Sequence, residues 1–577
     1  MERLEKKRIK GQTYYYYSKW EWVNGKCRRI WQKYLGKPEK ILKAFENNEH
    51  ASPHYAEVFQ FGLSTTLWNE CLGADIIEHV NALCPKRNQG LSSGEYIAIA
   101  SINRAIHPVS KTLMFDWFSQ TTLRRYFPSA SKTALLSQRF WDHMDRIDPK
   151  TALLIWQNII TEVIEREKID LSSICYDGTN FYTFIDTFNT QCPIAKRGKN
   201  KQGRSNLRQI SYALFCSSDG QIPLYSEVYE GNRNDTKQFP LMIEKFHNFL
   251  KTNWGDEIPL PQMTLIFDKG NNSKDNFALI DHFKFHYVGS MKLGQFKELA
   301  EISNQDSRFI ACQTIGLENT KTFRVEKKVY GKLRTLIVSY NQDLFHPQWL
   351  TLHNDIEKAV EQLKIVQQKL EDRANGLISK GKSPSINSIE TQCKNILKRQ
   401  YMRRVIWHRV SQGGHGIPQL DYEIDTKAIN AVSDTYLGKN LIVTDREEWN
   451  NEEIITAYRS QFNIENVFKE MKDRDIGSWW PLYHWTEQKI QIHSFYCTVA
   501  VLLRALAHRR VKKAGIKISM KRMLSELDQI KEILLLYPRK RGAKNKCQHT
   551  VLSKTSELQQ SLLSILQGKE TKNTELG

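Results

Sequence analysis

The chain has 577 residues, more than the roughly 250 to 300 at which a single hydrophobic core stops growing, so we expect several domains. Its 84 Lys and Arg residues against 63 Asp and Glu give a formal net charge of +21, which favours a polyanionic partner, nucleic acid first; a merely basic soluble protein is the alternative. Ten scattered cysteines without a CxxC pair exclude a Cys/His zinc site. The sequence has no signal peptide and no apolar stretch of about 18 residues, which predicts a soluble cytoplasmic protein with no membrane partner.

The first two predicted segments differ in their periodicity. Within residues 1–55, bulky and polar residues alternate from Tyr14 to about Lys43 around the turn pair Asn24-Gly25, which predicts a small β element containing a hairpin. Residues 56–168 show apolar positions three and four apart, and Ser92 with Glu95 is typical of a helix start. This helical region either binds DNA or packs on the rest of the protein.

The period changes to that of strands near Ile169. Consecutive strands are predicted in SSICYD, FYTFID, RQISYALFCS and QIPLYSEVY, followed by a helix in TKQFPLMIEKFHNFL, a strand in MTLIFD, a helix in SKDNFALIDHF and a strand in FHYVGSMK. This order predicts a mixed sheet flanked by helices and resembles an RNase H-like core. We assign this α/β core to residues 169–292 and 432–480, where it resumes with KNLIVTD and a helix from about Asn451 to Lys472.

Residues 293–431 are predicted to interrupt the core as an α+β insertion. Short strands, RTLIVSYN the clearest, precede two long polar helices joined at Gly381-Lys382-Ser383-Pro384, a helical hairpin whose second helix extends through Tyr401–Trp407. Residues 481–577 are predicted to be helical and basic, with one apolar helix in HSFYCTVAVLLRALAHR, the basic runs VKKAGIKISMKRM and PRKRGAKNK, and a frayed end from about Gln548. The basic runs are either solvated or contact phosphate.

Two aspartates are the first candidates for chemistry. Asp177 follows the apolar run Ile174–Tyr176 and Asp268 follows Leu265–Phe267, so each is expected to end a buried strand. Asp and Gly commonly end strands for turn reasons alone. As a pair, however, carboxylates at the ends of neighbouring strands could share hard divalent cations.

The helix 451–472 supplies the third candidate. Tyr458, Glu465 and Lys472 are seven residues apart and therefore share one helix face, since seven residues at about 100° each return to within roughly 20° of the start. Apolar neighbours such as Ile464 and Phe468 predict that Glu465 is held against the core, where it needs a partner such as a metal ion. An ordinary amphipathic helix with Glu465 and Lys472 exposed is the alternative.

The stretch Tyr458-x2-Gln461-x3-Glu465-x6-Lys472 resembles the Y-x2-R-x3-E-x6-K signature of bacterial DDE insertion-sequence transposases, whose catalytic core is RNase H-like. Gln461 stands where the signature has Arg, although Arg459 is two residues away. The blocks YDGT, PLYSEVYEGNRND, LIFDKG and PLYHWTEQKIQIH are also similar to blocks of this family, so the resemblance covers roughly Asp177 to Arg504.

The resemblance implies a DNA transposase that cleaves transposon ends and transfers the strands. Asp177, Asp268 and Glu465 would be the catalytic residues and would bind two Mg²⁺ ions, for which Mn²⁺ would substitute; one ion would activate water or the 3′-OH and the other would stabilise the leaving oxygen. The DNA-binding residues would be Tyr458, Arg459, Gln461 and Lys472. Lys472 would serve as a point charge and Tyr458 as a hydrogen-bond donor or stacking surface.

The partners implied are double-stranded DNA, the terminal inverted repeats and the target DNA, handled by a homodimer in the bacterial cytoplasm at the nucleoid. The insertion would help to hold hairpin-ended DNA, and Tyr401–Trp407 would contact a strand end or a partner helix. Two other functions stay open: an RNase H-like nuclease that cuts without joining, and a non-catalytic DNA-binding protein derived from a transposase. The retention of all three carboxylates argues against the non-catalytic protein.

Overall fold

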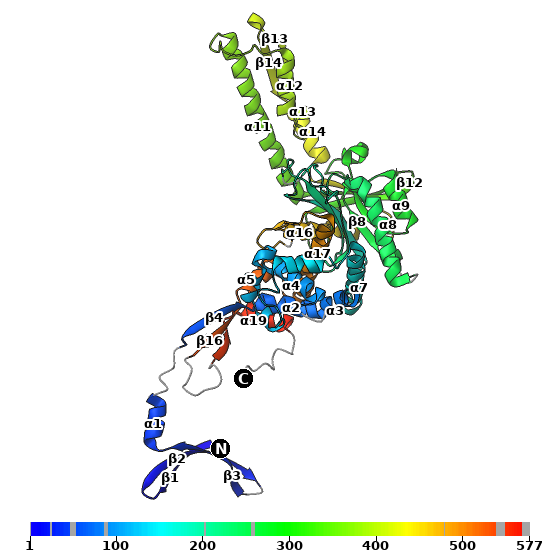
Figure 1. The fold of residues 1–577 in the computed structure, drawn as a ribbon. Coiled ribbons are helices and arrows are strands. Elements are labelled where there is room, and N and C mark those ends of the chain that lie inside the picture. The colour runs from blue at the N-terminus through cyan, green and yellow to red at the C-terminus, as the bar shows by residue number, and fades with distance from the viewer. Residues whose placement is uncertain are drawn as a thin grey trace. The chain divides into compact units, whose positions relative to one another are not determined.

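The computed structural model describes residues 2–23, 26–46, 53–85, 90–200, 203–255, 260–477, 479–537 and 548–567. Figure 1 shows the ribbon coloured from the N-terminus to the C-terminus. Contacts divide the chain into two units. Unit 1 gathers Met1–Thr65, Phe118–Tyr126 and Arg522–Gly577, and unit 2 contains Thr66–Trp117 and Phe127–Lys521.

The first sheet of unit 1 is antiparallel and three-stranded. It consists of β1 (Glu2–Ile9), β2 (Gln12–Val23) and β3 (Lys26–Gly36), and α1 (Pro38–Glu46) follows it. The predicted hairpin is confirmed by the pairing of β2 with β3, while Asn24-Gly25 lies outside the described residues. β1 was not predicted, because its charged sequence lacks an apolar alternation; it pairs with β2 along its whole length.

A second sheet of unit 1 joins segments from opposite ends of the chain. β16 (Lys531–Leu536) lies between β4 (Tyr55–Gln60) and β17 (Gln548–Leu552), and α19 (Glu557–Leu566) follows β17. The expectation of helix from residue 56, of a helical C-terminal region without strands and of a frayed end from about Gln548 was therefore wrong. Local periodicity does not reveal a strand whose partner is more than 450 residues away; the basic run PRKRGAKNK lies outside the described residues.

Helices precede and follow the central sheet of unit 2. The predicted helix start at Ser92 is confirmed: Ser92 and Glu95 form a reciprocal capping box. The apolar C-terminal helix packs against the fourth, sixth and seventh helices. The helices before and after the sheet are α2 (Gly62–Gly73), α3 (Ile76–Leu83), α4 (Ser93–Ile106), α5 (Met114–Ser119), α6 (Ser137–Met144), α7 (Pro149–Glu167), α17 (Glu487–Lys513) and α18 (Met520–Asp528). The start of α2, the end of α5 and most of α18 belong to unit 1.

α17 is long and apolar enough, by length and composition alone, to cross a membrane. Of its most apolar stretch, however, 94% is buried inside the protein. α17 is thus placed as a core helix of unit 2, covered by α4 and α7.

The central sheet of unit 2 has nine strands in the order β10-β11-β12-β15-β9-β8-β5-β6-β7. β5, β8 and β9 run parallel to one another and the remaining neighbours are antiparallel, so the expected RNase H-like mixed sheet is confirmed. The strands are β5 (Ser173–Tyr182), β6 (Gln209–Ser217), β7 (Pro223–Glu230), β8 (Thr264–Phe267), β9 (His286–Met291), β10 (Ile310–Ala311), β11 (Thr320–Val329), β12 (Lys332–Asn341) and β15 (Lys439–Thr444).

Two details of this sheet differ from the sequence prediction. SSICYD and the first two residues of FYTFID belong to one continuous strand, β5, because Asp177 and Gly178 stay paired with β6 instead of turning; residues 183–186 are not part of a strand. β10, β11 and β12, which the sequence pattern assigns to the insertion, extend the central sheet through the pairing of β12 with β15. The predicted helices α8 (Asp235–Trp254) and α9 (Lys274–His282) are present, and α8 packs against β7 and α9 against β9.

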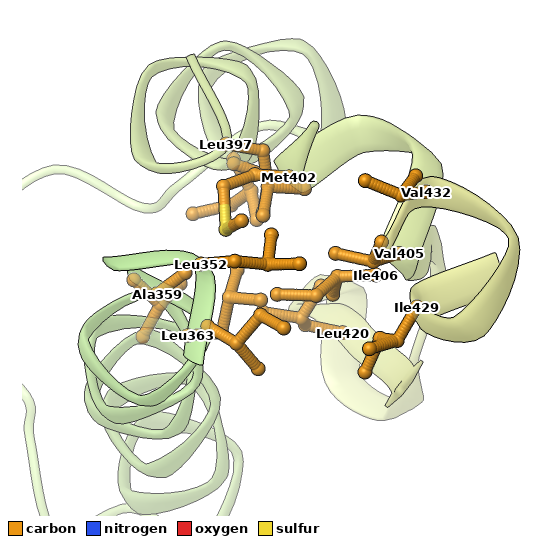
Figure 2. Packing of buried hydrophobic residues seen from close by; sticks show 14 of the residues in the cluster. Leu352, Ala359, Leu363, Leu397, Met402, Val405, Ile406, Leu420, Ile429 and Val432 are labelled. Atoms are coloured by element: carbon orange, nitrogen blue, oxygen red, sulfur yellow. The ribbon is translucent and has the colours of Figure 1, made fainter. Parts of the chain in front are cut away.

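The insertion beyond β12 has its own apolar core (Figure 2). The predicted helical hairpin is confirmed by α11 (Gln342–Ala374) and α12 (Ile386–Ile396), which run side by side in Figure 1. The predicted extension of the second helix through Tyr401–Trp407 was wrong, because Tyr401 has a φ of 68° that no α-helix continues through. The chain instead forms α13 (Met402–Val405), β13 (Ile406–Gln412), β14 (Pro418–Ile424) and α14 (Thr426–Tyr436).

Leu363 lies at the centre of this insertion core and is fully buried. Leu363→Ala is expected to cost about 2–5 kcal/mol of stability, because the lost side chain leaves a cavity among Leu352, Leu420 and their neighbours. Limited proteolysis should then cut the insertion earlier than in the wild type. Leu377→Ala, at an exposed position just after α11, is the control; equal protection of both variants would contradict the placement of Leu363.

Two basic side chains are buried near α17 with few polar partners. Lys111 and Arg104 are 8% and 2% exposed, and Lys111 Nζ has no hydrogen-bond partner among the described residues. Lys111 Nζ lies over the rings of Tyr496 and Phe140, at 4.5 and 4.9 Å from their centroids. Burial, and secondarily the charge of Arg104, lower the pKa of Lys111 well below its usual value of 10.5.

Lys111→Met is therefore expected to stabilise the protein at pH 7. Because the folded pKa is depressed, the unfolded chain takes up a proton that the folded chain does not, and stability falls as pH decreases below about 10.5, by about 1.4 kcal/mol per pH unit down to the folded pKa. Methionine removes this linkage, so the gain measured by urea unfolding should shrink between pH 7 and pH 10. A variant that is less stable than the wild type at pH 7 would contradict the lowered pKa of Lys111.

Candidate active site

Asp177 and Asp268 are brought together by the parallel pairing of β5 with β8. The register pairs Ser173 with Thr264 and Cys175 with Ile266. Continued by two residues, the same register places Asp177 opposite Asp268. Asp268 directly follows the end of β8, as predicted, whereas Asp177 lies within β5, where it faces Leu214 of β6, and not at a strand end.

Hydrogen bonds orient both carboxylates. The Gly178 N–H donates to Asp177 Oδ1 at 2.7 Å, and the Ser290 hydroxyl of β9 donates to Asp268 Oδ1 at 3.1 Å. Ser290 also accepts from the Lys269 N–H at 3.2 Å and is 4% exposed. Ser290 of β9 thus holds both Asp268 and Lys269 by hydrogen bonds. The sequence analysis missed it because a serine within a strand carries no signal of its own.

The predicted helix from Asn451 to Lys472 is two helices, α15 (Asn451–Arg459) and α16 (Phe462–Lys472). At the break, the Ser460 hydroxyl donates to the Ala457 carbonyl, and the Cys175 thiol of β5 donates to the Ser460 carbonyl at 3.4 Å. Tyr458 therefore does not share one continuous helix face with Glu465 and Lys472. α15 packs against β8 and β9, and α16 packs against β5.

Tyr458 nevertheless lies among the candidate carboxylates. Burial raises the pKa of the Tyr458 hydroxyl, the negative charges of Asp268 and Glu465 add to this rise, and a hydrogen bond with Ser290 opposes it. The pKa of the Tyr458 hydroxyl is thus influenced by residues just after β8, in β9 and in α16.

Glu465 is exposed, which corrects the expectation that the core holds it. Ile464, Val467 and Phe468 fill the buried face of α16, and Glu465 points away from that face. Among the described residues, no three His, Cys, Asp or Glu side chains converge closely enough to hold a metal ion. The available donors nevertheless fit Mg²⁺, because they are carboxylate oxygens. Two of the carboxylates, those of Asp177 and Asp268, stand opposite each other in the register of β5 and β8.

Lys472 joins the C-terminal end of α16 to β5. Its ammonium donates a hydrogen bond to the Thr179 hydroxyl, two residues after Asp177, and lies 5.6 Å from the centroid of the Phe181 ring. A cation is thereby held on the same strand as the first candidate carboxylate.

Arg459 and Gln461 do not supply the missing guanidinium of the signature. Arg459 donates to the Gly316 carbonyl at 2.7 Å and to the Thr320 hydroxyl at 2.9 Å. Its guanidinium therefore binds the loop before β11 and the first residue of that strand. Gln461 is 9% exposed at the break between α15 and α16. Arg459, although only two residues from Gln461, therefore has its guanidinium engaged by Gly316 and Thr320.

The Transposase DDE domain family matches residues 170–503, more than half of the chain. The chain belongs to this family. The matched range nearly coincides with the span from Asp177 to Arg504 over which sequence blocks resemble insertion-sequence transposases. The protein is thus a transposase, a DNA-cleaving enzyme that carries out DNA transposition.

No curated protein matches the transposase. Among solved structures, a piggyBac transposase synaptic complex with hairpin DNA is similar to it at 10% sequence identity and a TM-score of 0.32, covering 81% of this chain and 78% of that chain.

Asp235 is an acidic residue of the transposase that the sequence analysis did not single out. A Cβ placed on Gly178 would lie 3.8 Å from Asp235 Oδ1 and 3.1 Å from Tyr229 Oη, so the carboxylate stands beside the residue that follows Asp177. Burial raises the pKa of Tyr229, and the charges of Asp235 and Asp177 raise it further. The block PLYSEVYEGNRND, which ends on Asp235, was the signal that could have found it.

Proposed function

We propose that Asp177, Asp268 and Glu465 are the catalytic carboxylates with which this transposase cleaves and transfers DNA strands. The observation that carries the proposal is the register of β5 and β8, which places Asp177 opposite Asp268, together with the influence of both Asp268 and Glu465 on Tyr458. Glu465, which is exposed, would complete the set when cations and DNA bind.

The three carboxylates would bind two Mg²⁺ ions, or Mn²⁺ in their place. Bound there, the ions would activate the attacking water or 3′-OH and stabilise the leaving oxygen of an in-line displacement at phosphorus. Ser290 holds the Asp268 carboxylate in place, and the Gly178 N–H does the same for Asp177. Lys472 and Tyr458 would contact the DNA phosphates next to the scissile bond, Lys472 as a cation and Tyr458 as a donor.

The partners in this proposal are the terminal inverted repeats of a bacterial element and a target duplex, bound by a homodimer that brings two ends together in the cytoplasm at the nucleoid. The test is a plasmid that carries the gene with its flanking DNA, incubated with the protein and either Mg²⁺ or EDTA. Metal-dependent breaks at the repeats with joined products are expected. Breaks without joining would indicate a nuclease, and binding without breaks a non-catalytic protein.

Lys472→Met is expected to lower the rate of end cleavage by about 10- to 100-fold, because a charge-assisted hydrogen bond to phosphate contributes about 1.5–3 kcal/mol. Methionine keeps the length of the side chain and its packing over Phe181. Cleavage by Lys469→Met, at an exposed position of the same helix, is the matched control. Equal rates for the two variants would remove Lys472 from the site.

A further inference from the structure

The sheet β1-β2-β3 lies outside the matched family range and is strongly basic. Residues 1–46 contain 13 Lys and Arg against five Glu and no Asp. The same residues include eight Tyr and Trp, of which Trp22 is 76% exposed and Tyr34 51% exposed. An exposed basic and aromatic sheet has the charge that a polyanion requires.

One face of this sheet carries its cations stacked over aromatic rings. The guanidinium of Arg3 lies 4.5 Å from the centroid of Trp20, that of Arg29 lies 5.8 Å from the same ring, and Lys7 Nζ lies 4.8 Å from the centroid of Tyr16. The register agrees, since Trp20 pairs with Arg29 and the partners of Tyr16 and Ser18 are Glu5 and Arg3. We call Arg3, Lys7, Tyr16, Trp20 and Arg29 the stacked face.

A single carboxylate, Glu5, lies within the stacked face. It accepts hydrogen bonds from Trp20 Nε1 at 2.7 Å and from Gln32 Nε2 at 2.9 Å, and it lies 3.4 Å from Arg3 and 3.8 Å from Arg29. Glu5 therefore acts as an anchor that fixes the rings and the guanidinium groups. Three cations against one carboxylate leave the face positively charged.

We propose that the stacked face binds double-stranded DNA through its phosphates. Cations already ordered over rings lose less conformational entropy on binding than free lysines do. Because the cations cover the rings of Trp20 and Tyr16, these rings are not open to stacking by unpaired bases, which disfavours a single strand. β2 has 12 residues, about 40 Å at roughly 3.3 Å per residue, which is slightly more than one turn of duplex at about 34–36 Å. A two-stranded β-ribbon fits the major groove.

The opposite face of the same sheet provides a matched comparison. It carries Lys6, Arg8 and Lys33, for which the register shows the reverse orientation: Lys6 pairs with Tyr15 and Lys33 with Tyr17. Tyr17 on this face donates to Glu2 at 2.5 Å and stacks edge-on against Trp31. Removing three cations from either face changes the net charge by the same amount.

The proposal rests on the proposed function only for the choice of DNA as the polyanion, and it is tested by binding in EDTA, where no cleavage takes place. The probe is a labelled 30-base-pair duplex, titrated with the full-length protein at several salt concentrations. The triple variant Arg3→Ala, Lys7→Ala, Arg29→Ala is expected to lose about tenfold or more in affinity, with a salt slope smaller by about 2 to 3. Lys6→Ala, Arg8→Ala, Lys33→Ala should bind almost as the wild type does.

Cys27 supplies a readout on the unmutated protein. It is exposed, pairs with Trp22 on β2 and stands two residues from Arg29, whereas the other cysteines that the structure describes are buried. Duplex DNA should slow the alkylation of Cys27, located by peptide mass spectrometry, in the wild type and in the opposite-face variant.

Equal loss of affinity in both triple variants, unchanged alkylation of Cys27 with DNA, or tighter binding of a single strand of the same length would each overturn the proposal. If the stacked-face variant fails to fold, Arg3→Lys with Arg29→Lys keeps the charge and should retain most of the affinity. Cleavage of plasmid ends by the wild type, measured separately with Mg²⁺, tests the proposed function and does not depend on this result.

Discussion

Asp268→Asn is expected to reduce DNA cleavage by at least about a thousandfold, equivalent to roughly 4 kcal/mol of transition-state stabilisation, while DNA affinity in EDTA changes little. Asparagine keeps the shape of the side chain and its hydrogen bond from Ser290, but it removes the negative charge that would hold a divalent cation. Cleavage is measured on plasmid ends with Mg²⁺ and affinity on labelled end DNA without it.

Asp177→Asn and Glu465→Gln should behave in the same way, since all three carboxylates are proposed to hold the same pair of ions. Asp275→Asn, an isosteric change at an exposed position in the first turn of α9, is the matched control and should cleave at the wild-type rate. Full activity of any one of the three site variants would exclude that residue. Full activity of all three would exclude the site.

Where local pattern determines structure, the sequence predicts this protein well. The apolar runs before Asp177 and Asp268 are buried strands, and the capping box at Ser92 begins a helix. The signature residues lie in helices as predicted, but in two rather than one: Tyr458 lies on α15, and Glu465 and Lys472 lie on α16.

The parts that the sequence did not predict depend on distant contacts. The break between α15 and α16 occurs at Ser460, whose carbonyl accepts a hydrogen bond from Cys175 of β5. The periodicity of the helix sequence does not predict this contact with a distant strand. The strand β4 exists because β16 pairs with it from the other end of the chain. The exposure of Glu465 had a local signal, since the buried residues Ile464, Val467, Phe468 and Met471 recur three and four positions apart and leave Glu465 off their face of α16. Apolar neighbours in sequence are not the same as apolar neighbours on a helix face.

The segment between the signature helix and α17 gives the second large effect. Trp479 is fully buried, stacks on Phe181 with ring centroids 4.0 Å apart, and lies near Tyr212 and His493 at 5.5 and 5.4 Å. Burial lowers the pKa of His493 well below its usual value, so the neutral ring donates from Nε2 to the Trp479 carbonyl at 2.8 Å. Trp479 therefore joins β5, β6 and α17 at one point.

Trp479→Ala is expected to destabilise unit 2 by about 3–5 kcal/mol, because the residue leaves a large cavity between the sheet and α17. Urea unfolding followed by circular dichroism measures the shift, since a fluorescence readout would change with the loss of the indole. Cleavage should also fall, because Phe181 is four residues after Asp177 on β5 and loses its stacking partner.

Trp485→Ala, at a position of the same segment that is 46% exposed, should unfold close to the wild type, and Trp479→Phe should recover part of the stability. An alanine variant at Trp479 that unfolds and cleaves as the wild type does would mean that β5 is held in place without it. A variant that is destabilised but cleaves normally below its unfolding transition would separate the two roles: Trp479 would then support the fold, while β5 alone would position Asp177.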